Sequence, residues 1–208
     1  MTTFHVLIAT RGRPSLQRML ESLKPQLTSQ DHLTVVFDGL PIHTIPFDFQ
    51  NFVCKLHLYR EPTPLGYWGH AVRNKYAPLL HSTDFVMHAD DDDHYARHAF
   101  SQLRQSVQDK TTLYVAQMVM AGIYPKEKLI YSGNIGTPMG IIPYLLNTQG
   151  QWHLYGGGDG FFYEEIAKKV DNIVFLDFVI YVVRDSHYQE EDVVKELQED
   201  VVKEPNQA

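Results

Sequence analysis

Four consecutive aspartates, Asp90 to Asp93, follow the apolar run at residues 85–89 and constrain this chain more than any other feature. A short apolar run rich in β-forming residues predicts a buried strand, so the carboxylates stand where that strand ends. Open α/β sheets bind ligands at the carboxyl ends of their strands. Because adjacent like charges repel, the run favours a bound cation over its alternative, a solvated acidic turn.

The first 40 residues predict a strand, a helix and a second strand. Residues 4–9 and 33–37 are apolar runs, and Pro14 stands where a helix can begin between them. The apolar residues of that helix are three and four positions apart, at Leu16, Met19, Leu20 and Leu23. This order is typical of a βαβ unit in a parallel sheet.

The rest of the chain continues the alternation of strands and helices. Further strands are expected at residues 53–59, 85–89, 112–120 and 173–183, and further helices at 70–80, 96–107 and 160–170. Residues 122–158 are rich in Gly, Pro, Tyr and Asn, which indicates hairpins and loops where a second substrate is bound. The sequence therefore predicts an α/β fold with a mostly parallel central sheet flanked by helices.

The charge separates the chain into two parts. Residues 189–208 hold seven acids and two lysines, including a repeated Glu-Asp-Val-Val-Lys-Glu, and so carry most of the formal charge of -7. We expect one domain at residues 1–188 and an acidic tail or linker at residues 189–208. The acidic balance also argues against nucleic acid as the main partner.

A single cysteine, Cys54, excludes an intrachain disulfide and indicates a reducing compartment, the cytoplasm. No apolar run reaches the roughly 20 residues that a transmembrane helix needs. We therefore expect no transmembrane segment.

The spacing of the aspartates predicts how they are used. On an extended backbone, Asp90 and Asp92 face one side and Asp91 and Asp93 the other. Carboxylate oxygens at this density suit a hard divalent ion such as Mn²⁺ or Mg²⁺. One alternate pair is expected to bind the metal, while its neighbours hold the loop or contact a ligand.

Other charged residues stand near the same predicted edge. Asp38 ends an apolar strand and can accept hydrogen bonds from a nucleobase or ribose, although an Asp-Gly turn explains it equally well. Arg11 and Arg73 are placed to meet phosphate oxygens or to neutralise the aspartates, whereas surface charge is the better interpretation of Arg13. Asp159 follows three glycines at a predicted helix start, as a site carboxylate or as an N-cap.

The order of these motifs resembles that of the family 2 nucleotide-sugar glycosyltransferases, which have the Rossmann-like GT-A fold. Residues 8–14 and 20–26 are similar to the first strand, loop and helix of that family, and residues 35–39 to its nucleobase-binding strand end. Residues 71–74 resemble its Ala-Arg-Asn element, and residues 85–93 resemble its Asp-x-Asp strand, with Asp90 and Asp92 in the aligned places.

Two later segments extend the resemblance over residues 4–188. Residues 158–161 resemble the Glu-Asp element that supplies the general base, with glycine in place of the usual glutamate. Residues 183–187 are similar to a late element whose histidine, His187 here, completes the metal site. Less specifically, the chain resembles glycosyltransferase domains of large algal viruses, which often belong to longer chains; this would place it in the host cytoplasm.

The resemblance implies metal-dependent transfer of a sugar from a nucleoside diphosphate sugar, with UDP the expected nucleotide, to a hydroxyl of a glycan or glycoprotein. It implies Mn²⁺ or Mg²⁺ at Asp90, Asp92 and His187. Asp159 is then the general base of an inverting displacement, with a retaining route open if Asp159 only orients the donor. The residues expected to bind the nucleotide sugar are Thr10, Arg11, Asp38, Arg73, Asp90 and Asp91.

Aromatic residues are candidates for stacking on sugar faces. Trp152 is favoured over Tyr67 and Trp68 because it belongs to the glycine-rich region, although core packing is an equal alternative for each.

Two other function classes stay open. A sugar nucleotidyltransferase would use the same metal chemistry, but usually needs a glycine-rich basic loop, for which Gly12 alone is a poor substitute. A non-catalytic module that binds divalent ions or glycans would have no affinity for nucleotides. His88, His94 and His98 are a weak zinc signal, since no His-Glu-x-x-His element accompanies them.

Overall fold

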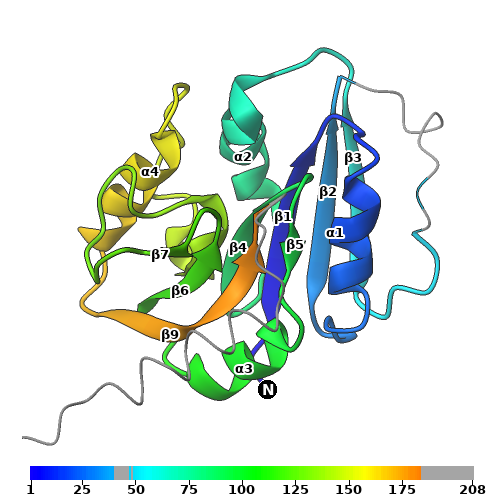
Figure 1. Ribbon diagram of the computed structural model, residues 1–208. Coiled ribbons are helices and arrows are strands. Elements are labelled where there is room, and N and C mark those ends of the chain that lie inside the picture. Colours follow the sequence, from blue (N-terminus) through cyan, green and yellow to red (C-terminus); the bar gives the residue numbers. More distant parts are fainter. Residues whose placement is uncertain (40–46, 48, 184–208) are drawn as a thin grey trace, which may run out of the picture.

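A computed structural model describes residues 1–39, 47 and 49–183, and in it the apolar runs of the sequence form one mixed sheet of nine strands (Figure 1). The strands are β1 (Phe4–Thr10), β2 (His32–Asp38), β3 (Lys55–Glu61), β4 (Phe85–Asp90), β5 (His94–Tyr95), β6 (Leu113–Val119), β7 (Ile123–Tyr124), β8 (Gly140–Pro143) and β9 (Ile173–Val182). The helices are α1 (Leu16–Leu23), α2 (His70–Tyr76), α3 (Ala99–Ser106) and α4 (Gly158–Ala167). Short 3-10 turns are η2 (Tyr67–Gly69), η3 (Ala77–Leu79), η4 (Thr137–Met139) and η5 (Tyr144–Leu146).

The N-terminal half of the sheet is parallel. Its strands lie in the order β3-β2-β1-β4, and every neighbouring pair among them is parallel. The register pairs Ala9 with Asp90 and Asp38 with Glu61, so the polar residues that end these strands come to one edge. This edge is the upper one in Figure 1, toward the start of α2.

Helices cover both faces of this parallel half, which explains why all seven residues of β1 are buried. Val6 and Ile8 pack in the same core cluster as Leu16, Met19, Leu20 and Leu23 of α1. Leu7 and Ala9 point to the other face and pack with Val72 and Tyr76 of α2. The period of two along β1 thus places α1 and α2 on opposite sides of the sheet.

The second half of the sheet is mixed. Strand β8 pairs antiparallel with both β4 and β6, β6 and β9 are parallel, and β5 is antiparallel to β9. The predicted α/β fold is confirmed, but the sheet is mixed rather than mostly parallel. Strands β7 and β8, from residues 122–158, and the short β5 all pair antiparallel with their neighbours. That region was expected to be hairpins and loops, and it contributes β7, β8 and two 3-10 turns.

Helix boundaries depart from the sequence expectation for local reasons. The helix expected at residues 70–80 ends at Tyr76, because Pro78 lies in the 3-10 turn that follows. The helix expected at residues 96–107 begins only at Ala99, since His98 has a left-handed φ of 69°. No helix in the described ranges combines the length and the apolar character that crossing a membrane requires. The predicted domain boundary, the tail at residues 189–208 and His187 lie outside the described residues.

Candidate functional site

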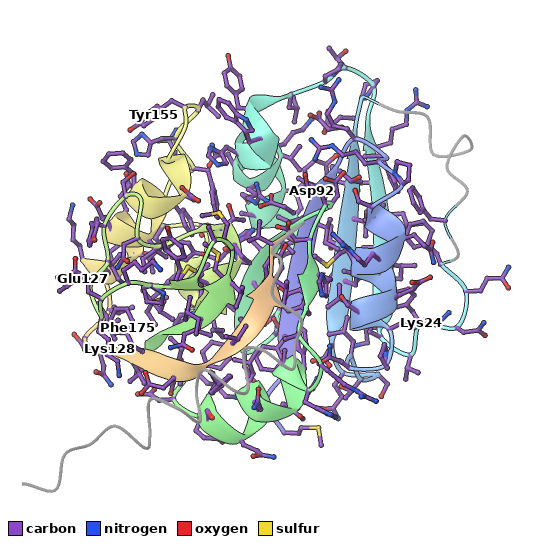
Figure 2. All side chains as sticks on the ribbon, in the orientation of Figure 1. Lys24, Asp92, Glu127, Lys128, Tyr155 and Phe175 are labelled. Atoms are coloured by element: carbon purple, nitrogen blue, oxygen red, sulfur yellow. The ribbon has the colours of Figure 1, made fainter. Side chains whose placement is uncertain are left out.

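A cleft of about 680 Å³ opens at the carboxyl ends of β1, β2 and β4. Its rim is formed by the turn before α2 and by the loop that leads into α4, the two segments at the upper side of Figure 1. Figure 2 shows Asp92 at this upper edge of the central strands and Tyr155 on the loop before α4. Of the predicted site residues, those that line the cleft are Thr10, Arg11, Asp38, Asp90, Asp91, Asp92 and Asp159.

Asp90 is held by Arg73. The Arg73 guanidinium is completely buried and donates to Asp90 Oδ1 at 2.6 Å and to the carbonyl of Ala89 at 3.0 Å. Arg73 does not line the cleft, so the expectation that it meets the donor phosphates is corrected. Its alternative role, neutralising the aspartates, fits the geometry. The described residues provide no partner for Asp90 Oδ2, and the side chain keeps 35% of its exposure.

Asp91 joins the ends of β1 and β4. The Thr10 hydroxyl donates to Asp91 Oδ2 at 2.7 Å, and the backbone N–H of Arg11 donates to the same oxygen at 3.2 Å. Burial raises the pKa of the Asp91 carboxyl, against the lowering effect of these hydrogen bonds. Thr10 and Asp91 both line the cleft, but the Thr10 hydroxyl and Asp91 Oδ2 are hydrogen-bonded to each other.

Asp92 pairs with Arg13, which the sequence analysis interpreted as surface charge. Arg13 forms an ion pair with Asp92 and lies 3.4 Å from Asp91, so it is part of the cleft rather than mere surface charge. Strand β4 ends at Asp90, and a turn follows. The strict alternation expected along all four aspartates therefore does not extend beyond the strand. Asp90, Asp91 and Asp92 all line the cleft.

Asp38 ends β2 and supports the neighbouring loop. Its Oδ1 accepts a hydrogen bond from the backbone N–H of Leu65 at 2.6 Å, and its Oδ2 accepts one from Gly66 at 2.9 Å. Asp38 is buried yet lines the cleft, so it carries negative charge at this end while it fixes the turn before α2.

Asp159 faces the aspartates from the other rim, in the first turn of α4. Its carboxylate accepts hydrogen bonds from the backbone N–H groups of Thr137 at 3.2 Å and of Gly160 at 2.9 Å. The residue before the helix, Gly157, has a left-handed φ of 81°, and no side-chain cap is formed there. Asp159 is therefore oriented by two backbone donors and is not the N-cap that the sequence left open.

Trp152 does not have its expected place. It is 1% exposed and stacks on Phe162 with ring centroids 4.2 Å apart. The Arg73 guanidinium lies 5.1 Å from its ring centroid. Because its ring is buried within the core, Trp152 is a packing residue, and the expectation of sugar stacking is corrected. Tyr67 and Trp68 line the cleft instead.

His70 lines the cleft and was missed by the sequence analysis. Its Nδ1 donates to the carbonyl of His153 at 2.6 Å, which links the start of α2 to the loop before α4. Burial lowers the pKa of His70, so the ring is held neutral. The only sequence signal was its position three residues before Arg73.

A divalent ion fits the charge and the donor atoms of this edge. Among the described residues, five aspartates line the cleft (Asp38, Asp90, Asp91, Asp92 and Asp159) against two arginines, with Arg73 behind them, so carboxylates exceed guanidiniums by two. Oxygen ligands suit Mn²⁺ or Mg²⁺, which are often bound by one or two carboxylates and complete their shells with phosphates and water. No group of three or more His, Cys, Asp or Glu side chains among the described residues is arranged as a metal site, and His187 lies outside them.

The histidines that suggested zinc are used elsewhere. His88 is fully buried, and its Nε2 lies 2.8 Å from Asn147 Oδ1. His98 is exposed, and neither His94 nor His98 lines the cleft.

At the level of sequence, no family model and no curated protein matches the chain. Solved structures do. A fragment of S. aureus TarS matches with a TM-score of 0.67 at 17% identity, over 88% of this chain and 60% of that one. The same fragment in complex with UDP-GlcNAc matches with a TM-score of 0.66 at 16% identity, over 97% and 66%.

A third similar structure is the mannosyltransferase PcManGT from Pyrobaculum calidifontis, in complex with GDP-Man and Mn²⁺. It matches with a TM-score of 0.65 at 16% identity, over 89% of this chain and 58% of that one. The chain has the GT-A glycosyltransferase fold. It spans less than two thirds of the length of each of these solved chains.

Proposed function

We propose that this GT-A chain transfers a sugar from a nucleoside diphosphate sugar to a hydroxyl group of a glycan or glycoprotein. The observation that carries the proposal is the cleft at the strand ends, where an excess of carboxylates faces Asp159 across about 680 Å³. The similar structures support it, since two of them are complexes with UDP-GlcNAc and with GDP-Man. We favour UDP as the nucleotide because the family resemblance implies it, and Asp38 is at the position where that resemblance expects the nucleobase.

Donor binding is assigned to the β1 and β2 side of the cleft. The Arg11 side chain is exposed at the cleft, and the described residues provide no partner for its guanidinium, which leaves it for phosphate oxygens. Asp38 is proposed for the nucleobase, with Thr10 and Asp91 shaping the pocket floor. Arg73 contributes indirectly, because it holds the Asp90 carboxylate in position.

A metal ion is proposed at Asp90 and Asp92, with His187 as a further ligand. Bound there, Mn²⁺ or Mg²⁺ would stabilise the negative charge of the diphosphate leaving group as a Lewis acid. Arg13, which pairs with Asp92, would supply positive charge to the same diphosphate.

Asp159 is proposed as the general base. The acceptor oxygen forms a bond to the anomeric carbon, the bond from that carbon to the diphosphate oxygen breaks, and the acceptor proton passes to the Asp159 carboxylate. The backbone donors at Thr137 and Gly160 fix the direction of that carboxylate. Attack from the side opposite the leaving group inverts the anomeric centre, and we propose inversion for this reason.

The cellular compartment and the polypeptide context of the chain are also proposals. Cys54 is a buried free thiol whose pKa is raised to about 11 by burial, an unreactive form that suits the reducing cytoplasm. Because similar solved chains are longer, we propose that this chain is one module of a longer polypeptide.

Isothermal titration calorimetry tests the proposal directly. UDP and GDP are titrated into the protein with Mn²⁺ and with a chelator, and a panel of nucleotide sugars is assayed for donor hydrolysis. We expect metal-dependent binding of one nucleotide, which Asp92→Asn abolishes together with turnover. Binding that is equally tight in chelator contradicts the metal assignment, and an active Asp92→Asn removes Asp92 from it. Glycan binding without nucleotide binding identifies a non-catalytic module, and turnover of nucleoside triphosphates identifies a nucleotidyltransferase.

A further inference from the structure

The turn before α2 has a positive φ at four consecutive residues. Gly66, Tyr67, Trp68 and Gly69 have φ values of 73°, 55°, 52° and 83°. Glycine adopts such angles freely, but in Tyr67 and Trp68 the Cβ atom crowds the following carbonyl. Two adjacent aromatic residues in this conformation are unfavourable, so something must hold them there.

Asp38, which lines the cleft, and the buried Arg73 behind it hold the two ends of this turn. Asp38 accepts hydrogen bonds from Leu65 and Gly66 at the first end, and the buried Arg73 Nη1 donates to the carbonyl of Trp68 at 3.0 Å at the second. A Cβ at Gly69 would lie 2.7 Å from the Cβ of Ala9, so the turn also lies tightly against β1. Strain that is fixed from several sides in this way is typical of functional sites.

The result of this arrangement is an exposed indole at the cleft. Trp68 lines the cleft and is 72% exposed, and the ring of His70 lies 6.4 Å from it. Burial of this side chain therefore contributes too little free energy to offset the backbone strain. Trp152, the second of two tryptophans, is by contrast 1% exposed. An unfavourable turn that presents an open aromatic face points to a ligand with a flat apolar face.

The position of Trp68 in the cleft identifies that ligand. The Asp38 end of the turn, at Leu65 and Gly66, lies by the proposed nucleobase site. Trp68 stands at the other end, where Arg73 donates hydrogen bonds both to its carbonyl and to the Asp90 carboxylate. Two residues later, His70 donates to the loop that precedes Asp159. Between Asp90 and Asp159 lie the proposed reacting atoms, so the indole is next to sugar rather than base.

We infer that Trp68 is a stacking platform for a pyranose ring, whose apolar C–H face lies on the indole while the cleft carboxylates accept hydrogen bonds from its hydroxyls. The inference rests on the proposed function. The same chemistry is offered by the transferred sugar of the donor and by a terminal sugar of the acceptor, and the experiment below separates them.

The test uses Trp68→Gly, which removes the ring and relaxes the turn, with Trp68→Tyr as the variant that keeps an aromatic face. Tyr131→Ala is the matched control, because Tyr131 is 40% exposed but does not line the cleft. For each, calorimetry gives the Kd of the nucleotide and of the nucleotide sugar, transfer assays give the acceptor KM and kcat, and a thermal melt gives Tm.

We expect Trp68→Gly to leave the nucleotide Kd unchanged and to raise Tm, since glycine fits the left-handed turn. If the donor sugar stacks there, the Kd of the nucleotide sugar rises about tenfold; if the acceptor sugar stacks there, the acceptor KM rises about tenfold. Trp68→Tyr restores most of either loss. Three results for Trp68→Gly would overturn the inference: an unchanged Kd of the nucleotide sugar together with an unchanged acceptor KM, an equal rise in the Kd of the nucleotide without its sugar, or a lower Tm.

Fluorescence keeps this test separate from that of the proposed function. Trp68 is the exposed indole, so stacking of a sugar on it changes the emission of the wild-type protein, whereas Trp152 is shielded. If the wild type binds no nucleotide, the proposed function fails, and the same titration with free oligosaccharides then tests Trp68 alone. No change in emission overturns the inference in that case as well.

Discussion

At the carboxyl ends of β1, β2 and β4 the chain gathers aspartates, whereas at the amino ends of β1, β2 and β3 it gathers histidines. His5, His32 and His57 come from these three strands, and His81 from the loop before β4. The rings of His57 and His81 stack with centroids 4.2 Å apart, and His32 Nδ1 lies 3.0 Å from His57 Nε2. Both ends therefore crowd ionisable groups of one kind.

The histidine end avoids charge. Burial lowers the pKa of His5 to about 3 and of His32 to about 4, and it lowers the pKa of His57 as well. The neighbouring Lys55 works in the same direction, whereas Asp31 opposes it at His32. The ring nitrogens of His5 are used internally, by the carbonyl of His81 and the hydroxyl of Thr34.

The aspartate end sets arginines against its carboxylates. Arg73 pairs with Asp90, and Arg13 with Asp91 and Asp92. Neutral stacked rings need no ligand, but carboxylates that outnumber their arginines at an open cleft favour a cation. The comparison teaches that crowding alone does not indicate a site, whereas crowding with an excess of one charge among the described residues does.

Asp159→Asn gives the largest expected effect and tests whether the aspartate end alone does the chemistry. Without the carboxylate, transfer is expected to fall by about 10²–10⁴-fold, the usual contribution of a general base. Donor binding measured by calorimetry is expected to stay intact. The control is His57→Gln at the histidine end, which is expected to leave turnover at neutral pH unchanged. Unchanged transfer in Asp159→Asn removes it as the base.

Arg73→Met tests how far the aspartate end depends on its buried cation. The substitution leaves the carbonyls of Trp68 and Ala89 without their donor and Asp90 without its ion pair. Breaking a buried pair costs about 3 kcal/mol, which urea unfolding measures as a lower free energy of unfolding. Arg11→Met, at an exposed arginine, is the matched control and is expected to change stability by less than about 0.5 kcal/mol. Equal effects of the two would refute the positioning role.

Sequence reasoning reached the carboxyl-edge residues because strand ends and polar runs are local signals. The apolar run at residues 85–89 predicts where β4 ends, and parallel strands bring Asp38 and Asp90 to one edge. The comparison structures confirm the fold class that this pattern predicted. The periodicity of Leu16 to Leu23 likewise predicts α1, which begins at Leu16 rather than at the expected Pro14.

The misses are residues whose role depends on contacts distant in the chain. Trp152 and Arg73 lie far apart in the sequence. The residues next to Trp152 in the chain do not show whether its indole packs under a guanidinium or faces solvent. The pairing of Arg13 with Asp92 is also long-range. The left-handed turn at Trp68 is enforced by Asp38 and Arg73, so its flanking glycines were the single local sign of it.

Acidification is expected to lower the stability of the fold first through the histidines at the amino ends of the strands. Since the pKa values of His5 and His32 are lowered on folding, the unfolded chain binds protons near its ordinary pKa of 6.5 while the folded chain does not. Stability is therefore complete above that pH and falls below it. The two histidines together remove about 2 kcal/mol between pH 6.5 and 5.5. Urea unfolding across this range measures the loss.

Two variants decide whether the histidine end causes that loss. His57→Gln removes one member of the stack, so the fall in stability between pH 6.5 and 5.5 is expected to become shallower. His98→Asn changes an exposed histidine and is expected to leave the fall as it is, with asparagine tolerating the left-handed φ of 69°. If His57→Gln and the wild type lose stability in parallel, the stack is not the origin.

Arg13→Met gives the smallest change in stability and sharpens the contrast in charge. The Arg13 side chain is 48% exposed, so loss of its pairs is expected to cost about 0.5 kcal/mol, far less than loss of Arg73. Carboxylates then exceed guanidiniums by a larger margin among the described cleft residues, and Mn²⁺ binding without nucleotide is expected to tighten in calorimetry. Nucleotide binding is expected to weaken, because Arg13 no longer faces the diphosphate. Weaker Mn²⁺ binding in this variant would mean that the aspartates do not attract the cation by their excess charge.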